Sequence, residues 1–378
     1  MKIAFLVERP TQFEAPFYRY AANVGGGELV PFFTEPEPAA PPFDPELGRE
    51  VRWGIDLLGG YPHELVPQNG RGAWLRERLG GCDLLITNGY TRRPYLLAAA
   101  IARRGGVPTG LRLDSVLFDA SPTRRRAKRL LVSGLLARAY DLFFGVGTLT
   151  LDYLRACGVP PERTALFPYA VDVEHFRAGS RRTAEARQAA RERLGVSPDA
   201  KLVLSLAKFN PREAPWDLVH AFPRLPDGVA LVLAGDGPQR AELESLAAEL
   251  APGRVRFPGY VPYPELPELY AAADVFVHPA REERWGVSVQ EALACGLPVV
   301  ASSRVGAAHD LVLPGRNGEV YEAGDWEGLA CRLAAALALD PAGVRAENER
   351  VLAAWDYAAA WRGLLDAAER VTKRRAAA

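Results

Sequence analysis

The sequence predicts an α/β protein made of two Rossmann-like domains with parallel sheets. Short apolar runs of strand length alternate with helical patterns along the chain, which is typical of parallel sheets covered by helices on both faces. The length of 378 residues favours two domains, since one domain usually takes roughly 100–200 residues. Because open parallel sheets bind ligands at the carboxyl ends of their strands, we expect the two domains to face each other across a cleft.

The first half of the chain begins with a buried strand and then alternates helices and strands. Its expected strands are Ile3–Val7, Leu29–Phe33, Asp83–Thr87, Thr109–Leu113, Leu142–Val146 and Leu166–Tyr169. Its expected helices are Phe17–Asn23, Arg93–Arg104, Arg124–Tyr140 and Leu149–Cys157. The proline-rich segment Glu35–Pro45 has no periodicity and predicts a surface loop.

The second half repeats this plan. Its expected strands are Leu202–Ala207, Val229–Ala234, Val255–Phe257, Val275–Pro279 and Pro298–Ala301. Its expected helices are Ala184–Leu194, Pro215–Phe222, Gln239–Leu250, Leu266–Ala272, Val287–Cys295, Trp326–Leu339 and Gly343–Arg370. We therefore place an N-terminal domain at residues 1–172 and a second domain at 173–355. A C-terminal helix at 356–378 can cross back onto the first domain.

Composition excludes several classes of function. Lys plus Arg equals Asp plus Glu, at 46 each, so net charge gives no argument for a nucleic-acid partner. The N-terminus lacks the features of a signal peptide, and no run of 18 apolar residues exists, which predicts a cytoplasmic protein. The five histidines and four cysteines form no metal-binding pattern, so we expect no metal.

A basic segment allows two interpretations. Arg124–Arg129 precedes the apolar stretch Leu130–Tyr140. A basic amphipathic helix can lie peripherally on an anionic membrane surface, here the inner one. The other interpretation is a solvated helix face.

The most informative segment is Phe276–Ala301, in which a strand, a loop and a helix follow one another. The N–H groups of Trp285, Gly286 and Val287 lie at the start of the helix, where they can bind an anion or a hydroxyl group. Glu283 lies in the loop, and the side chain of Glu291 leans back toward the same helix end. Two carboxylates and a row of amides suit a polyhydroxylated, phosphorylated ligand.

This spacing resembles the family 4 retaining glycosyltransferases, which have the GT-B fold. Glu283 and Glu291 are separated by seven residues, with Trp285–Gly286 between them and Ala292–Pro298 after them. Other family-like motifs follow in the expected order: Gly235–Pro238, Val255–Val261, Ala272–Pro279, Gly306–Ala308 and Gly315–Gly318. The resemblance is dense over residues 200–325, whereas over residues 1–175 it is weaker.

The resemblance implies roles for the donor-binding residues. Glu291 would bind the nucleotide ribose, and Glu283 the hydroxyls of the donor sugar. The amides of Trp285, Gly286 and Val287 would meet the sugar or the diphosphate. Gly235, Tyr260 and Val261 belong to the family-like motifs that would line the donor site.

The phosphate side of the expected site follows the strand Leu202–Ala207. Lys208 and Arg212 leave that strand end and can neutralise a departing diphosphate. The family resemblance implies a second lysine at position 213, where this chain has Glu213. We expect Arg212 to replace that lysine, and Glu213 to point away from the phosphates or to pair with a basic residue.

The acceptor side should lie in the first domain, although the family's Gly-Gly loop is missing there. The loop containing Thr11, Gln12 and Glu14 follows the first strand, while Tyr90 and Arg112 lie at later strand ends. We expect these residues to contact the acceptor. Asp114 lies near the position where the family often has a histidine; it can orient an acceptor hydroxyl or cap the following turn.

The resemblance implies transfer of a sugar from a nucleotide diphosphate sugar to an acceptor hydroxyl with retention of anomeric configuration, without metal or cofactor. A UDP-sugar is the favoured donor and a GDP-sugar the next. The acceptor would be a sugar, a lipid-linked compound or a small molecule. Two alternatives stay open: a nucleotide-sugar epimerase, and a non-catalytic protein that binds nucleotide sugars.

Overall fold

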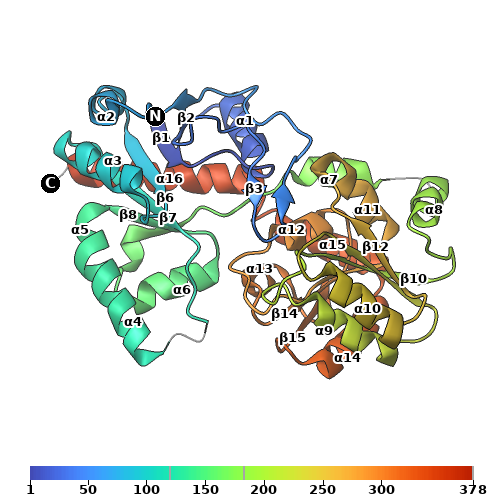
Figure 1. Cartoon of the computed structure of the whole chain (residues 1–378). Coiled ribbons are helices and arrows are strands. Elements are labelled where there is room, and N and C mark those ends of the chain that lie inside the picture. The colour runs from blue at the N-terminus through green and yellow to red at the C-terminus, as the bar shows by residue number, and fades with distance from the viewer. Residues whose placement is uncertain (119–120, 182–183, 377–378) are drawn as a thin grey trace. The chain divides into compact units, whose positions relative to one another are not determined.

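The computed structural model describes residues 1–118, 121–181 and 184–376. The chain divides into two compact units (Figure 1). Unit 1 contains Met1–Ala40, Asp56–Val171 and the chain from Trp355 onward, and unit 2 contains Pro41–Ile55 and Asp172–Ala354. Each unit has one large sheet in which all the paired strands are parallel, so the predicted α/β class is confirmed.

The sheet of unit 1 has seven strands in the order β5-β2-β1-β6-β7-β8-β9. Their bounds are β1 (Lys2–Val7), β2 (Glu28–Phe33), β5 (Glu64–Leu65), β6 (Leu84–Asn88), β7 (Thr109–Leu113), β8 (Leu142–Gly145) and β9 (Thr164–Leu166). The interior strand β1 is buried from Ile3 to Val7, because helices cover both faces of such a sheet.

The helices of unit 1 are α1 (Glu14–Val24), α2 (Arg71–Leu79), α3 (Arg93–Arg104), α4 (Pro122–Arg129), α5 (Ala137–Ala139), α6 (Thr148–Ala156) and α16 (Tyr357–Ala376). A 3₁₀ turn spans Pro161–Arg163. The helix expected over Arg124–Tyr140 begins at Pro122, and its middle, Leu130–Leu136, has π-helical geometry. The wider turn interrupts the regular i→i+4 bonding that the sequence pattern suggested.

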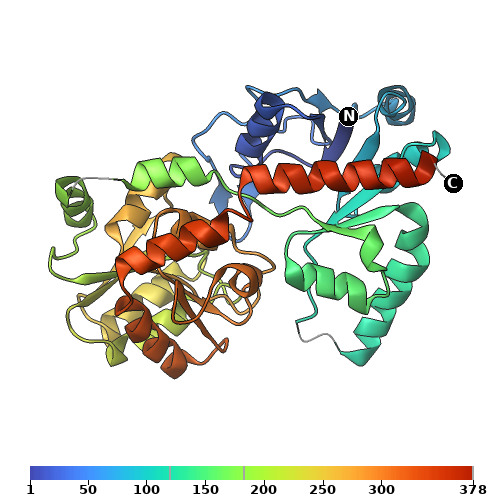
Figure 2. The same cartoon turned by 180° about the vertical axis from the view of Figure 1, so that it is seen from behind.

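The C-terminal helix α16 packs within unit 1. Trp361 Nε1 donates to Gly25 O at 2.9 Å, and Tyr357 OH donates to Phe13 O at 3.4 Å. Figure 2 shows this red helix lying along the unit that holds the N-terminus. The segment Gly343–Arg370, expected as one helix, is two helices. Asp356 Oδ1 accepts from Ala359 N at 2.7 Å and thereby starts α16 as a separate element.

The sheet of unit 2 has six strands in the order β12-β11-β10-β13-β14-β15. Their bounds are β10 (Lys201–Leu206), β11 (Val229–Ala234), β12 (Val255–Gly259), β13 (Val275–His278), β14 (Val299–Ser302) and β15 (Gly318–Tyr321). The last of these strands was not expected from the sequence. Strand order reverses between β10 and β13, and a parallel sheet binds its ligand at such a point.

The helices of unit 2 are α7 (Val173–Ser180), α8 (Ala184–Arg193), α9 (Pro215–Ala221), α10 (Arg240–Leu250), α11 (Leu266–Ala272), α12 (Val287–Ala294), α13 (Gly306–Leu311), α14 (Trp326–Leu337) and α15 (Pro341–Leu352). Short 3₁₀ turns span Phe222–Arg224 and Tyr263–Glu265. Leu218 of α9, Leu243 of α10 and Leu333 of α14 share one core with the sheet residues Val203 and Val277.

The division into units has one feature that the sequence did not suggest. Pro41–Ile55 follows the second strand of unit 1 in the chain, yet it belongs to unit 2. It contains a two-stranded antiparallel hairpin, β3 (Phe43–Asp44) and β4 (Arg49–Glu50) (Figure 1). Half of the expected surface loop Glu35–Pro45 is therefore part of a hairpin that packs in the other unit.

Candidate functional site

The loop after β10 is shaped by Asn210. Its side-chain Oδ1 accepts from the backbone N–H groups of Arg212 and Glu213, each at 3.0 Å. Ala214 then adopts φ 49°, and no other non-glycine residue in the described ranges has a positive φ. Left-handed backbone costs an alanine about 1–2 kcal/mol, and such strain gathers at functional sites. The turn fixes the positions of Arg212 and Glu213 at the carboxyl edge of the sheet.

Arg212 is the central cation of the site. Its guanidinium lies 3.2 Å from Glu283 Oε2 and 2.8 Å from Glu213 Oε1. Arg281 N donates to Arg212 O at 2.8 Å, which ties the loop after β10 to the loop after β13. Glu213 therefore pairs with a basic residue, as one of the two sequence expectations had it.

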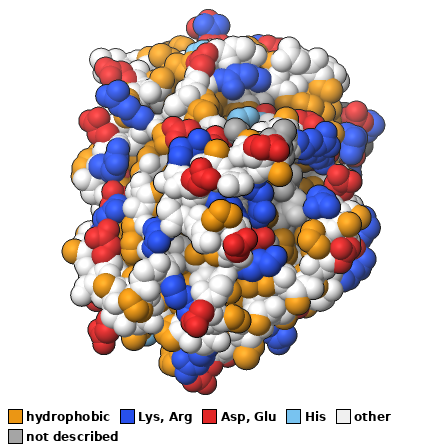
Figure 3. Space-filling model, turned by 90° about the vertical axis from the view of Figure 1, so that its right-hand side faces the viewer, with side chains coloured by type: hydrophobic (Ala, Val, Ile, Leu, Met, Phe, Trp, Pro, Cys, Tyr) orange, Lys and Arg blue, Asp and Glu red, His pale blue; other side chains and the backbone are white. Residues whose placement is uncertain are grey.

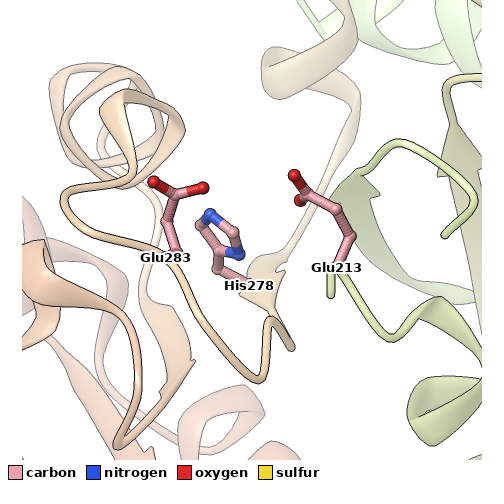
Figure 4. A group of neighbouring side chains, drawn as sticks. All are labelled: Glu213, His278 and Glu283. Carbon is pink, nitrogen blue, oxygen red and sulfur yellow. The ribbon is translucent and has the colours of Figure 1, made fainter. Parts of the chain in front are cut away.

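Glu213 also approaches Glu283. The pKa of the Glu213 carboxyl is raised to about 7, first by burial and then by the negative charge of Glu283, although the positive charge of Arg212 partly offsets both effects. His278 lies between these two carboxyl groups (Figure 4). One ligand-type atom from each of the three side chains falls within 4.8 Å of the others. The guanidinium of Arg212 already supplies positive charge to both carboxylates.

His278 stays neutral in this setting. Its ring is 3% exposed, and burial lowers its pKa below the usual value. Its Nδ1 is buried and has no hydrogen-bond partner among the described residues. Because the imidazole is neutral, Arg212 is the cation that pairs with both Glu213 and Glu283.

The start of α12 is built around Gly286. This glycine has φ 95°, and a Cβ added there would lie 3.1 Å from the His278 ring and from Val305, so only glycine fits without strain. Trp285 N donates to Glu283 Oε1 at 3.3 Å, and the buried Trp285 ring donates from Nε1 to Gln290 at 2.9 Å. Val287 is half-buried as the first residue of α12.

Glu291 is held inside unit 2. It is 2% exposed, and Tyr270 OH donates to its Oε2 at 2.8 Å. The pKa of Glu291 is raised to about 7, because burial outweighs the lowering by the hydrogen bond from Tyr270. A carboxyl with such a pKa carries part of its charge at neutral pH. The sequence motif pointed to Glu291, whereas nothing in it pointed to Tyr270.

Loops after β11 and β12 complete this edge of the sheet. Gly235 has φ 143°, and a Cβ there would lie 1.8 Å from Ala207 O. Gly235 N donates to Gly259 O at 2.8 Å, which joins the ends of β11 and β12. Tyr260 and Val261 follow β12 and are half-buried. The predicted donor residues thus lie on the loops at one edge of one sheet and on α12, which begins there.

Lys208 forms ion pairs with two acidic residues of the hairpin that contains β3 and β4. Its Nζ lies 2.8 Å from Asp44 Oδ2 and 2.7 Å from Glu46 Oε2. Arg212 reaches Glu46 at 3.3 Å. No sequence pattern indicates this pairing, since more than 160 residues separate the partners.

In unit 1, Arg112 and Glu14 form a buried ion pair instead of the predicted acceptor contact. The pair is 3.0 Å long, and the side chains are 3% and 7% exposed. Arg112 also donates to Phe167 O and Pro168 O, and the Phe167 ring lies 4.3 Å from its guanidinium. With these partners, Arg112 ties the ends of β7 and β9 to α1 and has almost no surface left for an acceptor.

The other predicted acceptor residues remain accessible. Thr11 and Gln12 are half-buried before α1, where Thr11 Oγ1 accepts from Glu14 N at 3.2 Å. Tyr90 and Asp114 follow β6 and β7, also half-buried. These four residues keep their predicted place at strand ends of unit 1.

Comparison with known proteins agrees with this architecture. The family model described as "Glycosyl transferases group 1" matches residues 186–350. A GDP-mannose-dependent alpha-(1-6)-phosphatidylinositol monomannoside mannosyltransferase of Mycolicibacterium smegmatis is 31% identical over 292 residues, which is 73% of each chain. A D-inositol 3-phosphate glycosyltransferase of Xylanimonas cellulosilytica is 37% identical over 60% of this chain and 56% of its own length. The chain thus spans little more than half of that relative.

Solved structures match almost the whole chain. Anabaena HepE in complex with UDP superimposes with a TM-score of 0.75 at 20% identity, covering 97% of this chain and 99% of the other. Sucrose-phosphate synthase from Thermosynechococcus elongatus gives 0.68 at 22% identity, covering 99% and 100%. At these identities the likeness shows the fold, which is the GT-B arrangement of two Rossmann-like domains.

Fold and sequence together define a GT-B protein. The chain belongs to the glycosyltransferase group 1 family, a family of enzymes that the spacing of Glu283 and Glu291 had indicated. None of the helices in the described ranges has the length and hydropathy to cross a membrane.

Proposed function

We propose that this protein transfers a sugar from a nucleotide diphosphate sugar to an acceptor hydroxyl with retention of anomeric configuration. The observation that carries the proposal is the meeting of Arg212 with Glu283 at 3.2 Å. It brings a cation suited to phosphate next to the carboxylate expected to bind the sugar. This meeting occurs where the strand order reverses, which is where a Rossmann-like sheet takes its ligand.

Each residue has a proposed task. Lys208 and Arg212 stabilise the charge that develops on the leaving diphosphate, which is usually the largest catalytic contribution. Glu291 accepts hydrogen bonds from the ribose, and Glu283 from the donor sugar. The remaining residues of the donor set, Trp285 to Val287, Gly235, Tyr260 and Val261, shape the site. Since Arg212 and Lys208 supply the positive charge, we expect turnover to continue after treatment with a metal chelator.

The acceptor would be held by unit 1. Thr11, Gln12, Tyr90 and Asp114 have partly accessible side chains at strand ends there. Asp114 keeps both roles considered for it, orienting an acceptor hydroxyl or capping the turn after β7. Glu14 and Arg112 would act by holding these loops in place.

The nucleotide base stays open between uracil and guanine. Two relatives are described as GDP-mannose-dependent mannosyltransferases, and a structure with the same fold was solved with UDP. The sequence resemblance favoured a UDP-sugar, with a GDP-sugar next.

One experiment tests the reaction and its alternatives. UDP- and GDP-hexoses are incubated with and without a polyol acceptor, and the products are followed by NMR. We expect nucleoside diphosphate release that depends on acceptor, and a product with the donor's anomeric configuration. An inverted product contradicts the proposal. Sugar isomerisation without acceptor favours an epimerase, and donor binding without any turnover favours a non-catalytic protein.

We also propose a peripheral membrane contact through α4 and the π-helical segment Leu130–Leu136 after it. Leu130 and Leu135 are 69% and 64% exposed, and Arg124, Arg125 and Arg126 beside them are exposed too. Apolar and basic side chains together favour anionic lipid. Vesicles of phosphatidylserine and phosphatidylcholine should sediment the protein, and Leu130→Ser with Leu135→Ser should prevent this. The control is Leu96→Ser with Leu97→Ser, which changes two exposed leucines of α3.

A further inference from the structure

We propose that the hairpin Pro41–Ile55 pairs its own carboxylates with Lys208 and Arg212, the cations proposed to bind the diphosphate, and must move away from them when the donor binds. We call this hairpin the plug. This inference rests on the proposed role of Lys208 and Arg212 in binding the diphosphate. It concerns the regulation of that site. The contacts that carry it all lie within unit 2.

The hairpin presents its acids in a fixed geometry. Phe43 pairs with Glu50, and Asp44 with Arg49. Asp44 Oδ1 accepts from the backbone N–H groups of Glu46 at 2.9 Å and Leu47 at 3.3 Å. This local turn uses one oxygen of Asp44. The other oxygen, Oδ2, is left for Lys208.

The carboxylates contact both proposed phosphate ligands. Lys208 Nζ lies 2.8 Å from Asp44 and 2.7 Å from Glu46, and Arg212 lies 3.3 Å from Glu46. Burial disfavours the ionised forms of Asp44 and Glu46, but the hydrogen bonds and charge of Lys208 outweigh it and lower both pKa values. Both acids are therefore anions at neutral pH.

The hairpin is also anchored by weaker contacts after β4. Tyr263 N donates to Trp53 O at 3.2 Å, and Tyr260 OH lies 3.5 Å from Arg52 O. The Arg49 guanidinium lies 5.5 Å from the centre of the Tyr260 ring. Tyr260 belongs to the predicted donor-binding residues, so the hairpin contacts the expected site at two places, the cations Lys208 and Arg212 and the residue after β12.

Competition follows from the chemistry of the cations. Two carboxylates on Lys208 and Arg212 match the two negative charges of a diphosphate diester. While the hairpin stays in place, its carboxylates take up N–H groups of Lys208 and Arg212 that phosphate oxygens would otherwise accept. A protein whose competent state is partly populated binds its ligand more weakly in proportion. The plug would thus lower donor affinity, and its release would accompany donor binding.

The test neutralises the plug without changing its shape. Asp44→Asn with Glu46→Gln keeps the turn acceptor and removes both charges. Affinities for UDP and GDP are measured by calorimetry, with uridine and guanosine as probes that lack phosphate. We expect whichever of UDP and GDP binds better to bind about ten-fold more tightly to the double variant than to the wild type. A ten-fold gain corresponds to a plug that is closed in about nine-tenths of the wild-type molecules. The affinity of the matching nucleoside should not change.

A matched control separates contact from general charge. Glu50→Gln removes one charge from the exposed side of the same hairpin, and its diphosphate affinity should equal that of the wild type. An equal gain in this control overturns the plug, because a diffuse field would then explain the effect. Unchanged or weaker binding in the double variant also overturns it.

Failure of the proposed function gives a different result. Lys208→Ala and Arg212→Ala are made in the wild type and in the double variant. If neither lowers diphosphate affinity in either background, the cations do not bind diphosphate and the proposed function of this loop fails. If both lower it while the double variant binds like the wild type, only the plug fails.

A second readout follows the hairpin itself. Arg49 and Arg52 are exposed trypsin sites in and beside β4. Saturating UDP or GDP should accelerate cleavage at these two residues, read by mass spectrometry, because a released hairpin is cut more readily. Slower cleavage, or no change with a nucleotide that calorimetry shows to bind, contradicts release.

Discussion

Glu291 combines deep burial with a single hydrogen bond, and this makes its charge sensitive to pH. Its pKa is raised to about 7 by burial, whereas an unfolded chain releases this proton near pH 4.5. Between these values the folded state holds more protons than the unfolded state. The contribution of Glu291 to stability is therefore complete below about pH 4.5 and is lost as pH rises through about 7.

We therefore expect Glu291→Gln to flatten the dependence of stability on pH. Thermal melting at intervals from about pH 5 to about pH 8 should show the wild type losing more stability than the variant. Glu249→Gln, on the exposed surface of α10, serves as the control and should follow the wild type. If Glu291→Gln melts in parallel with the wild type across this range, the carboxyl does not titrate as inferred.

Arg212 gives a second prediction at the same scale. Its loss leaves Glu213 and Glu283 without their shared cation. It also removes a positively charged hydrogen-bonding partner from the leaving diphosphate. Arg212→Ala should lower turnover at least about ten-fold, or about 1.4 kcal/mol of transition-state stabilisation. Arg212→Lys should recover part of it, because a lysine restores the charge but not the planar fork. A silent Arg212→Ala with an inactive Glu213→Ala would instead give Glu213 a direct role.

Single residues show where sequence reasoning reached and where it stopped. The seven-residue spacing placed Glu283 and Glu291 on the correct loop and helix, because a strand, a glycine turn and a helix form from local signals. The partners Tyr270 and Asn210 stayed hidden, since hydrogen bonds between distant or unremarkable residues leave no pattern. Arg112 was placed at the correct strand end, but its burial depended on Phe167 and Glu14 from other segments.

At the scale of elements, the turn at Gly235 joins two strands of the donor sheet. A Cβ at Gly235 would overlap Ala207 O at 1.8 Å, whereas Gly253, also with positive φ, has no such neighbour within 4 Å. Gly253→Ala should cost roughly 1–2 kcal/mol, the penalty for a left-handed alanine. Gly235→Ala should cost clearly more and weaken nucleotide binding. Denaturant unfolding and calorimetry check both effects, and equal destabilisation would contradict this account of the turn.

The elements were predicted well where periodicity is local, and less well where one segment meets another. The strands from β10 to β14 match the expected runs closely. The single helix expected over Gly343–Arg370 is interrupted between α15 and α16, near the start expected for the C-terminal helix at 356–378. Helical composition continues through this break, and the cap at Asp356 begins α16 as a new helix. The hairpin of β3 and β4 was missed for a different reason: its strands are two residues each, and the Lys208 loop that stabilises it lies far along the chain.

The whole molecule separates into two units with separate hydrophobic cores. All the predicted donor residues belong to unit 2, and all the predicted acceptor residues belong to unit 1. Charges of both signs are interspersed over the face drawn in Figure 3, in keeping with a net charge of zero. Recognition of an anionic donor must therefore come from the local cations Lys208 and Arg212 and not from a field of the whole surface.

Nucleotide binding should for this reason be visible as stabilisation that depends on the donor residues. A ligand that binds only the folded state stabilises it by about 2.7 kcal/mol at a hundred times its dissociation constant. In a thermal-shift series with UDP, GDP, ADP and dTDP, we expect UDP or GDP to raise the melting temperature most.

Glu291→Ala and the pair Lys208→Ala with Arg212→Ala should each reduce that shift, the first by loss of ribose contacts and the second by loss of phosphate contacts. Thr11→Ala, in unit 1, should leave it unchanged, because the donor site is complete without that residue. Equal shifts with all four nucleotides would mean that the protein does not discriminate the base. A full shift in Glu291→Ala would mean that Glu291 does not bind the ribose.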